Sequence, residues 1–127
     1  MPNYMQGVKG ALKISWGTPP AGLERQALDH LEQFLGHLNT RAAAKEFEAP
    51  QFYISTTCNA SKEIAMIVLH GDMETLYGLL FEQEFQQRIT LLSSVAQNFT
   101  TSYYVAGAMA ENARKVYGAA AAQLRAG

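Results

Sequence analysis

The sequence predicts an α+β protein with one four-stranded antiparallel sheet and helices on a single face of that sheet. Two observations lead to this fold class: segments that alternate apolar and polar residues are interspersed with segments of helical spacing, and their order is β-α-β-β-α-β-α. The composition, 48% hydrophobic and 17% charged, is that of an ordinary globular protein. A length of 127 residues suits one domain, so we expect a single domain over residues 1–127.

A strand and then a helix are expected in the first third of the chain. Residues 11–16 alternate apolar with polar side chains, which is the period of a strand covered on one side. The apolar set is Leu12, Ile14 and Trp16. Residues 17–22 contain two prolines and two glycines, which break both kinds of element, so we expect a loop there. Helical spacing of apolar residues begins at Leu23 and predicts a helix to about Ala44.

A hairpin is expected next. Residues 51–56 alternate in polarity and are rich in aromatic and β-branched side chains, which favours a strand. Residues 58–62 are typical of a turn. Residues 64–69 are apolar on both faces, as in an interior strand covered on both sides. We therefore expect these two strands to pair.

Two helical pieces, a strand and a closing helix complete the chain. Gly71 and Asp72 provide a helix start with Asp72 as N-cap. The apolar stripe then shifts phase between Gly78 and Glu84, which predicts a break in the helix. Residues 99–105 are rich in Thr, Tyr and Val and predict a strand. The closing helix carries one apolar face, formed by Met109, Ala113, Val116, Ala120 and Leu124.

These elements predict a ferredoxin-like βαββαβ fold with an additional C-terminal helix, in which strands 11–16 and 64–69 are central. Because the helices cover one face, side chains on the other face must meet water, a ligand or another protein. Alternation places Lys13, Ser15 and Tyr53 on this open face, together with one of Tyr103 and Tyr104. The mixture of polar and apolar residues there predicts a homodimer formed through the open face.

Several short motifs accompany this order of elements. They are Ile14-Ser15-Trp16-Gly17, Gly22-Leu23-Glu24, Gly71-Asp72 and Glu82-Gln83-Glu84-Phe85. With them the chain resembles the dimeric α+β-barrel superfamily, in particular an uncharacterised group of small bacterial proteins within it. The resemblance implies two ferredoxin-like sheets packed face to face, often around a small cavity. Members of the superfamily include cofactor-independent monooxygenases, isomerases, haem-dependent enzymes and stress-induced proteins of unknown role, so the resemblance implies no particular substrate.

The candidate ligand-binding residues are Lys13, Ser15, Tyr53 and Tyr103. An ammonium group on a central strand requires compensation by a carboxylate, by a dimer partner or by an anionic ligand, so an acidic small molecule is one hypothesis. The alternative is that the stem of Lys13 packs on the sheet while its head reaches solvent or an acidic group of the partner. The tyrosines can donate hydrogen bonds to a ligand or serve in packing alone.

The candidate catalytic residues are His70 and Asp72 at the end of the third strand. A histidine beside a carboxylate can act as a general base whose ring the acid orients. The alternative is that Asp72 caps the following helix and His70 closes a strand edge. His30 and His37 lie two helical turns apart, too far to share a metal ion directly, so we expect no metal site and no cofactor.

Charge and composition exclude several classes of partner. Ten basic and eleven acidic residues are interspersed along the chain and leave a formal charge of −1, which argues against nucleic acid and anionic membrane as partners. The sequence shows no long apolar segment and no signal-like start, so we expect a cytoplasmic protein. Cys58 is the single cysteine, which excludes an internal disulfide and a thiolate metal site within one chain.

Three functions remain open after these exclusions: a dimer that binds a small, partly apolar molecule in a cavity between sheets, a cofactor-independent monooxygenase or isomerase-like enzyme built on the same cavity, and a structural or partner-binding dimer. A phosphate-binding glycine loop, a serine nucleophile elbow and an aromatic RNA-binding signature are absent from the sequence.

Overall fold

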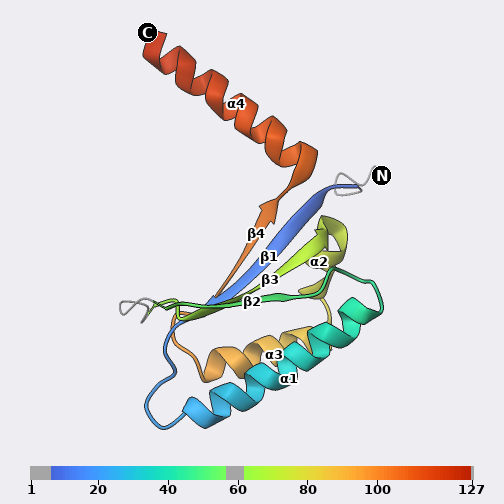
Figure 1. Cartoon of the computed structure of the whole chain (residues 1–127), viewed down its shortest axis with the longest axis vertical. Helices are drawn as coiled ribbons and strands as arrows, with labels where there is room; N and C mark the ends of the chain where they lie inside the picture. The colour runs from blue at the N-terminus through green and yellow to red at the C-terminus, as the bar shows by residue number, and fades with distance from the viewer. Residues whose placement is uncertain (1–6, 57–61, 127) are drawn as a thin grey trace.

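The computed structural model describes residues 7–56 and 62–126, and Figure 1 shows the arrangement of their elements. In chain order these are β1 (Lys9–Trp16), α1 (Glu24–Ala43), β2 (Gln51–Ile54), β3 (Ala65–Asp72), α2 (Met73–Leu79), α3 (Gln83–Ser94), β4 (Thr100–Val105) and α4 (Gly107–Ala126). The predicted order of elements is confirmed. The main difference in bounds is that β3 continues to Asp72, while β2 ends at Ile54.

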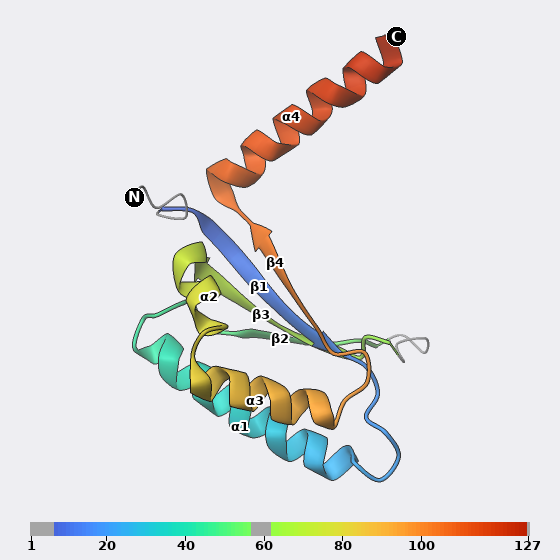
Figure 2. The ribbon, with the colours of Figure 1, turned by 180° about the vertical axis from the view of Figure 1, so that it is seen from behind.

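The strands form one antiparallel sheet in the order β2-β3-β1-β4, so the prediction that the first and third strands are central is confirmed. The predicted pairing of the second and third strands is confirmed as well. Helices α1 and α3 lie side by side under one face of the sheet, and α4 extends to the other side (Figures 1 and 2). None of the helices in the described part of the chain is long and apolar enough to cross a lipid bilayer.

The core lies between the sheet and the two helices beneath it. Leu12 and Ile14 of β1 are fully buried, as their alternation with polar neighbours predicts. Phe34 of α1 and Phe85 of α3 meet in an edge-to-face contact with ring centroids 5.6 Å apart. This aromatic pair holds the two helices together beneath the sheet.

The predicted break in the second helical region is confirmed, because α2 ends at Leu79 and α3 begins at Gln83. The guanidinium of Arg41, in the last turn of α1, fixes this break in space. It donates two hydrogen bonds to Glu82 at 2.7 and 2.8 Å and two to Glu46 at 3.0 and 2.7 Å. These bonds raise the pKa of Arg41 and lower the pKa of Glu46, so the ion pairs persist at neutral pH.

The strand β1 begins two residues earlier than its alternating pattern, and this extension depends on Gly10. A Cβ atom at Gly10 would lie 2.0 Å from Sδ of Met73 and 2.6 Å from the carbonyl oxygen of Tyr104. The absence of a side chain therefore allows α2 and β4 to approach β1 closely at this end of the sheet.

Candidate functional site

The open face of the sheet is assembled from alternate residues of all the strands, and the strand register places them in four rows. The rows are Lys9–Asp72, His70–Ala11–Tyr104, Gln51–Val68–Lys13–Ser102 and Tyr53–Met66–Ser15–Thr100. Directly paired residues of antiparallel strands point to the same side, so each row lies on one face. The helices α1 and α3 lie on the opposite side (Figures 1 and 2). We call this surface the open face below.

Lys13 lies at the middle of the open face and is paired with a carboxylate of its own chain. Its Nζ lies 2.9 Å from Oε1 of Glu63, and only 27% of the Lys13 side chain is exposed. The hydrogen bond to Glu63 raises the pKa of Lys13, so the ammonium remains charged. The sequence analysis expected a carboxylate, a dimer partner or an anionic ligand to compensate the ammonium of Lys13. The structure provides a carboxylate, that of Glu63.

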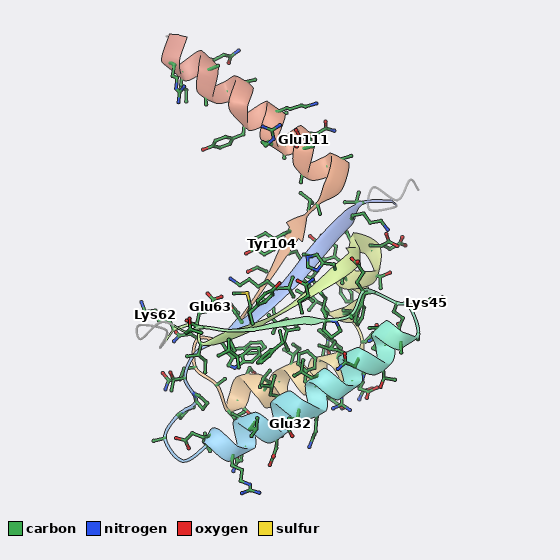
Figure 3. All side chains as sticks on the ribbon, in the orientation of Figure 1. Glu32, Lys45, Lys62, Glu63, Tyr104 and Glu111 are labelled. Atoms are coloured by element: carbon green, nitrogen blue, oxygen red, sulfur yellow. The ribbon has the colours of Figure 1, made fainter. Side chains whose placement is uncertain are left out.

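Glu63 is a site residue that the sequence analysis missed. It precedes β3, beside the turn-rich segment, where no periodicity indicates which side chain reaches the sheet. A hollow of about 310 Å³ adjoins it and is lined in part by Tyr53 and Met66 of the open face. Figure 3 labels Glu63 and Tyr104, which lie toward opposite ends of the sheet.

The other two predicted residues of the open face, Ser15 and Tyr53, are found there with hydrogen-bond partners. The hydroxyl of Ser15, which is buried, shares a 2.8 Å hydrogen bond with the hydroxyl of Thr100. The hydroxyl of Tyr53 donates to Oε1 of Gln51 at 2.6 Å, and the ring is half exposed at the edge of the sheet. Tyr53 is therefore available for contact with a ligand, whereas Ser15 would have to exchange one hydrogen bond for another.

Of Tyr103 and Tyr104, between which the sequence does not decide, Tyr103 is the one that does not lie on the open face, although it is one of the candidate ligand-binding residues. Tyr103 points to the helix side, where its ring centroid lies 4.3 Å from that of Tyr77 and its hydroxyl donates to the carbonyl of Leu76 at 3.0 Å. Burial raises the pKa of Tyr103 to about 12. Its neighbour Tyr104 occupies the open face instead, half exposed and near enough to Lys13 to contribute to its raised pKa.

His70 also lies on the open face, across the short side chain of Ala11 from Tyr104. The proposed orienting contact with Asp72 is not formed: in the described part of the chain, the carboxylate of Asp72 pairs with Nζ of Lys9 at 2.5 Å. Asp72 occupies the N-cap position of α2, as predicted, but its side chain makes no capping hydrogen bond. His70 is thus placed for contact with a ligand, without a carboxylate that fixes its ring.

The sheet order, the antiparallel pairing and the helices on one face define the ferredoxin-like class of α+β proteins. Comparison with solved structures bears out this class. No protein-family model matches the chain, and comparison with curated proteins gives no match.

Several structural neighbours are dimeric ferredoxin-like proteins of unknown function from bacteria, consistent with the resemblance to the dimeric α+β-barrel superfamily. A dimeric ferredoxin-like protein of unknown function from Thermobifida fusca YX superposes with a TM-score of 0.59 at 13% identity, over 83% of this chain and 97% of its own. A second such dimer, from Bacteroides fragilis NCTC 9343, has a TM-score of 0.59 at 7% identity, over 77% and 96%.

Enzymes share the fold. The hydroxynitrile lyase of Passiflora edulis superposes with a TM-score of 0.60 at 9% identity, over 78% of this chain and 94% of its own. A proposed antibiotic biosynthesis monooxygenase from Deinococcus radiodurans gives 0.53 at 14% identity, over 78% and 92%. At these identities the likeness establishes the fold alone.

Proposed function

We propose that this protein is a homodimer whose two open faces meet and enclose a site for a small, partly apolar molecule. The observation that carries the proposal is the Lys13–Glu63 pair, whose lysine lies between Val68 and Ser102 in the strand register. Ligand sites typically combine an apolar lining with a few convergent polar groups. The open face provides both, because Val68 pairs with Lys13 while Met66 and Tyr104 lie in the rows on either side of it.

The surface area of the chain supports a dimer. Its accessible surface is 8474 Å², whereas a folded monomer of 13.9 kDa is expected to expose about 6,700 Å². The excess of roughly 1,800 Å² is more than the area, about 800 Å², that one partner buries in a standard interface. The dimeric state of the neighbouring structures from Thermobifida fusca and Bacteroides fragilis supports the same assembly.

The charge of the site favours a neutral ligand. Glu63 already compensates the ammonium of Lys13, so the pair adds no net charge to the open face. An acidic molecule would have to displace Glu63, whereas a carbonyl or hydroxyl oxygen can accept a further hydrogen bond from Lys13. An aromatic or aliphatic body would then lie against Val68, Met66 and Tyr104.

A second candidate function, a cofactor-independent enzyme of the monooxygenase or isomerase kind, is favoured by the position of His70. It faces Tyr104 across Ala11, the smallest side chain on the open face, so a substrate seated over Ala11 would lie between a possible base and a hydroxyl. Consumption of a bound ligand, and its dependence on His70, would separate this function from binding alone.

The proposal is tested by calorimetric titration of the protein with neutral aromatic ketones and alcohols and with their carboxylate counterparts. We expect neutral members to bind, and Lys13→Met to weaken them about tenfold or more, since a hydrogen bond from a charged group contributes about 1.5–3 kcal/mol. The control is Lys45→Met, which replaces an exposed lysine on the loop after α1 and should leave the affinity for these compounds unchanged.

A double variant and the control decide whether the open face contains a ligand site that depends on Lys13. The double variant Lys13→Met, Glu63→Gln removes the carboxylate that the single change leaves unpaired, and it should bind as weakly as the single variant. If no compound binds the wild-type protein, or if Lys45→Met weakens binding as much as Lys13→Met, the ligand site is refuted. The dimer would then have the structural or partner-binding role.

A further inference from the structure

Helix α4 is a long amphipathic helix whose apolar side is exposed. It covers 20 residues, about 30 Å in length. Val116 is 71% exposed and Leu124 is 83% exposed. We call its apolar side the α4 stripe; it consists of Met109, Ala113, Val116, Tyr117, Ala120 and Leu124. The opposite side is polar and carries an ion pair between Glu111 and Arg114.

The stripe has the size and character of a contact surface. Soluble monomers rarely leave a continuous row of large apolar side chains in water, and helices far from a packed partner are only marginally stable. Figure 3 shows the side chains of α4, Glu111 among them, clear of the sheet and of the other helices. The stripe therefore requires a partner outside this copy of the chain.

The direction of α4 is set where it leaves β4. The amide of Ala106 donates to the carbonyl of Lys9 at 2.8 Å, which holds the end of β4 against β1. Gly107 follows with φ of 63°, a left-handed conformation that glycine adopts without strain and that turns the chain out of the sheet. Both views show α4 projecting on the side of the sheet away from α1 and α3, which is the side of the open face (Figures 1 and 2).

We propose that the α4 stripe packs against the second copy of the chain in the dimer, so that each protomer clasps its partner with this helix. The inference rests on the proposed dimer through the open face. A partner seated on the open face lies on the side toward which α4 projects, so one two-fold axis brings both helices against the opposite protomer. The proposed dimer already places a second copy of the chain at the open face, on the side toward which α4 projects, so this copy is the occupant that we propose for the stripe.

The test compares two charge-matched double variants by sedimentation equilibrium. Val116→Asp, Leu124→Asp places two carboxylates in the α4 stripe, and Gly118→Asp, Ala122→Asp places two on the exposed opposite side. We expect the first variant to raise the dimer dissociation constant at least about a hundredfold, since each buried Val or Leu contributes about tenfold or more to affinity. The control should shift it less than about threefold.

Amide hydrogen exchange provides an independent readout in the wild-type protein. In the dimer, amides of residues 111–125 should be protected, and dilution below the dissociation constant should remove this protection. Protection that persists in the monomer would place α4 on its own chain and overturn the inference.

An open-face variant, Val68→Asp, separates the inference from the proposed dimer. If Val68→Asp dissociates the dimer while the stripe variant behaves like its control, the dimer stands and the role of α4 is overturned. A wild-type chain that is monomeric at tens of micromolar overturns both. Dissociation by Val68→Asp and by the stripe variant, but not by the control, is the expected result.

Discussion

Replacement of Phe85 by alanine tests the layer of helices that leaves the opposite face of the sheet open. Phe85 is fully buried on α3 and meets Phe34 of α1 edge to face at 5.6 Å. Phe81, four residues earlier, lies in the link between α2 and α3 and is 85% exposed. The same substitution at these two positions therefore removes the same atoms from opposite environments.

The expected effects differ widely. Phe85→Ala removes a buried ring and leaves a cavity, which costs about 3–5 kcal/mol, including the contact with Phe34. Phe81→Ala removes a ring that is already in water and should change the free energy of unfolding by no more than about 0.5 kcal/mol. With a total stability of about 5–15 kcal/mol, the first change should lower the urea midpoint by more than about 1 M.

Urea unfolding followed by tryptophan fluorescence measures both variants, because Trp16 is the single tryptophan and is buried beside Phe52. All samples must have the same protein concentration, since dissociation of a dimer contributes to the apparent stability. Equal losses at Phe85 and Phe81, or a loss below about 1 kcal/mol at Phe85, would refute the packing of α1 against α3.

Two further predictions concern stability. Burial lowers the pKa of His37, whose Nδ1 lies 3.5 Å from Glu84, so the imidazole stays neutral in the folded chain while the unfolded chain takes up a proton near pH 6.5. The free energy of unfolding should therefore fall as the pH drops below about 6.5, and denaturant titrations should show a shallower fall for His37→Gln; identical slopes would contradict this. Gly10→Ala should cost about 1–3 kcal/mol through its clash with Met73. Gly36→Ala, within α1 and with open space around it, should gain up to about 1 kcal/mol; calorimetric melting that ranks the two glycine variants alike would count against the close approach at Gly10.

The fold could be predicted from the sequence because its central features are periodic. The alternation of Leu12, Ile14 and Trp16 fixes which side of β1 meets the helices, and Lys13 and Ser15 follow on the other side. These features depend only on neighbours along the chain. The phase shift that predicts the break between α2 and α3 is local in the same sense.

The site could be predicted only in part, because its remaining features depend on contacts between distant residues. The segment of β4 lacks alternation, so the choice between Tyr103 and Tyr104 is made by its pairing with β1 and by the contact of Tyr103 with Tyr77. Lys9 captures Asp72 across 63 residues, and no local pattern indicates this pairing. Glu63 reaches Lys13 from a segment without periodicity, which explains why it was missed.

The amount of surface to be covered connects the open face with α4. The projecting helix α4 adds to the surface that this chain exposes beyond the area expected of a compact monomer. The α4 stripe projects on the same side of the sheet as the open face, so one two-fold contact can cover both surfaces. Two unrelated partners would have to recognise the open face and the α4 stripe separately, whereas a second copy of the chain covers both surfaces.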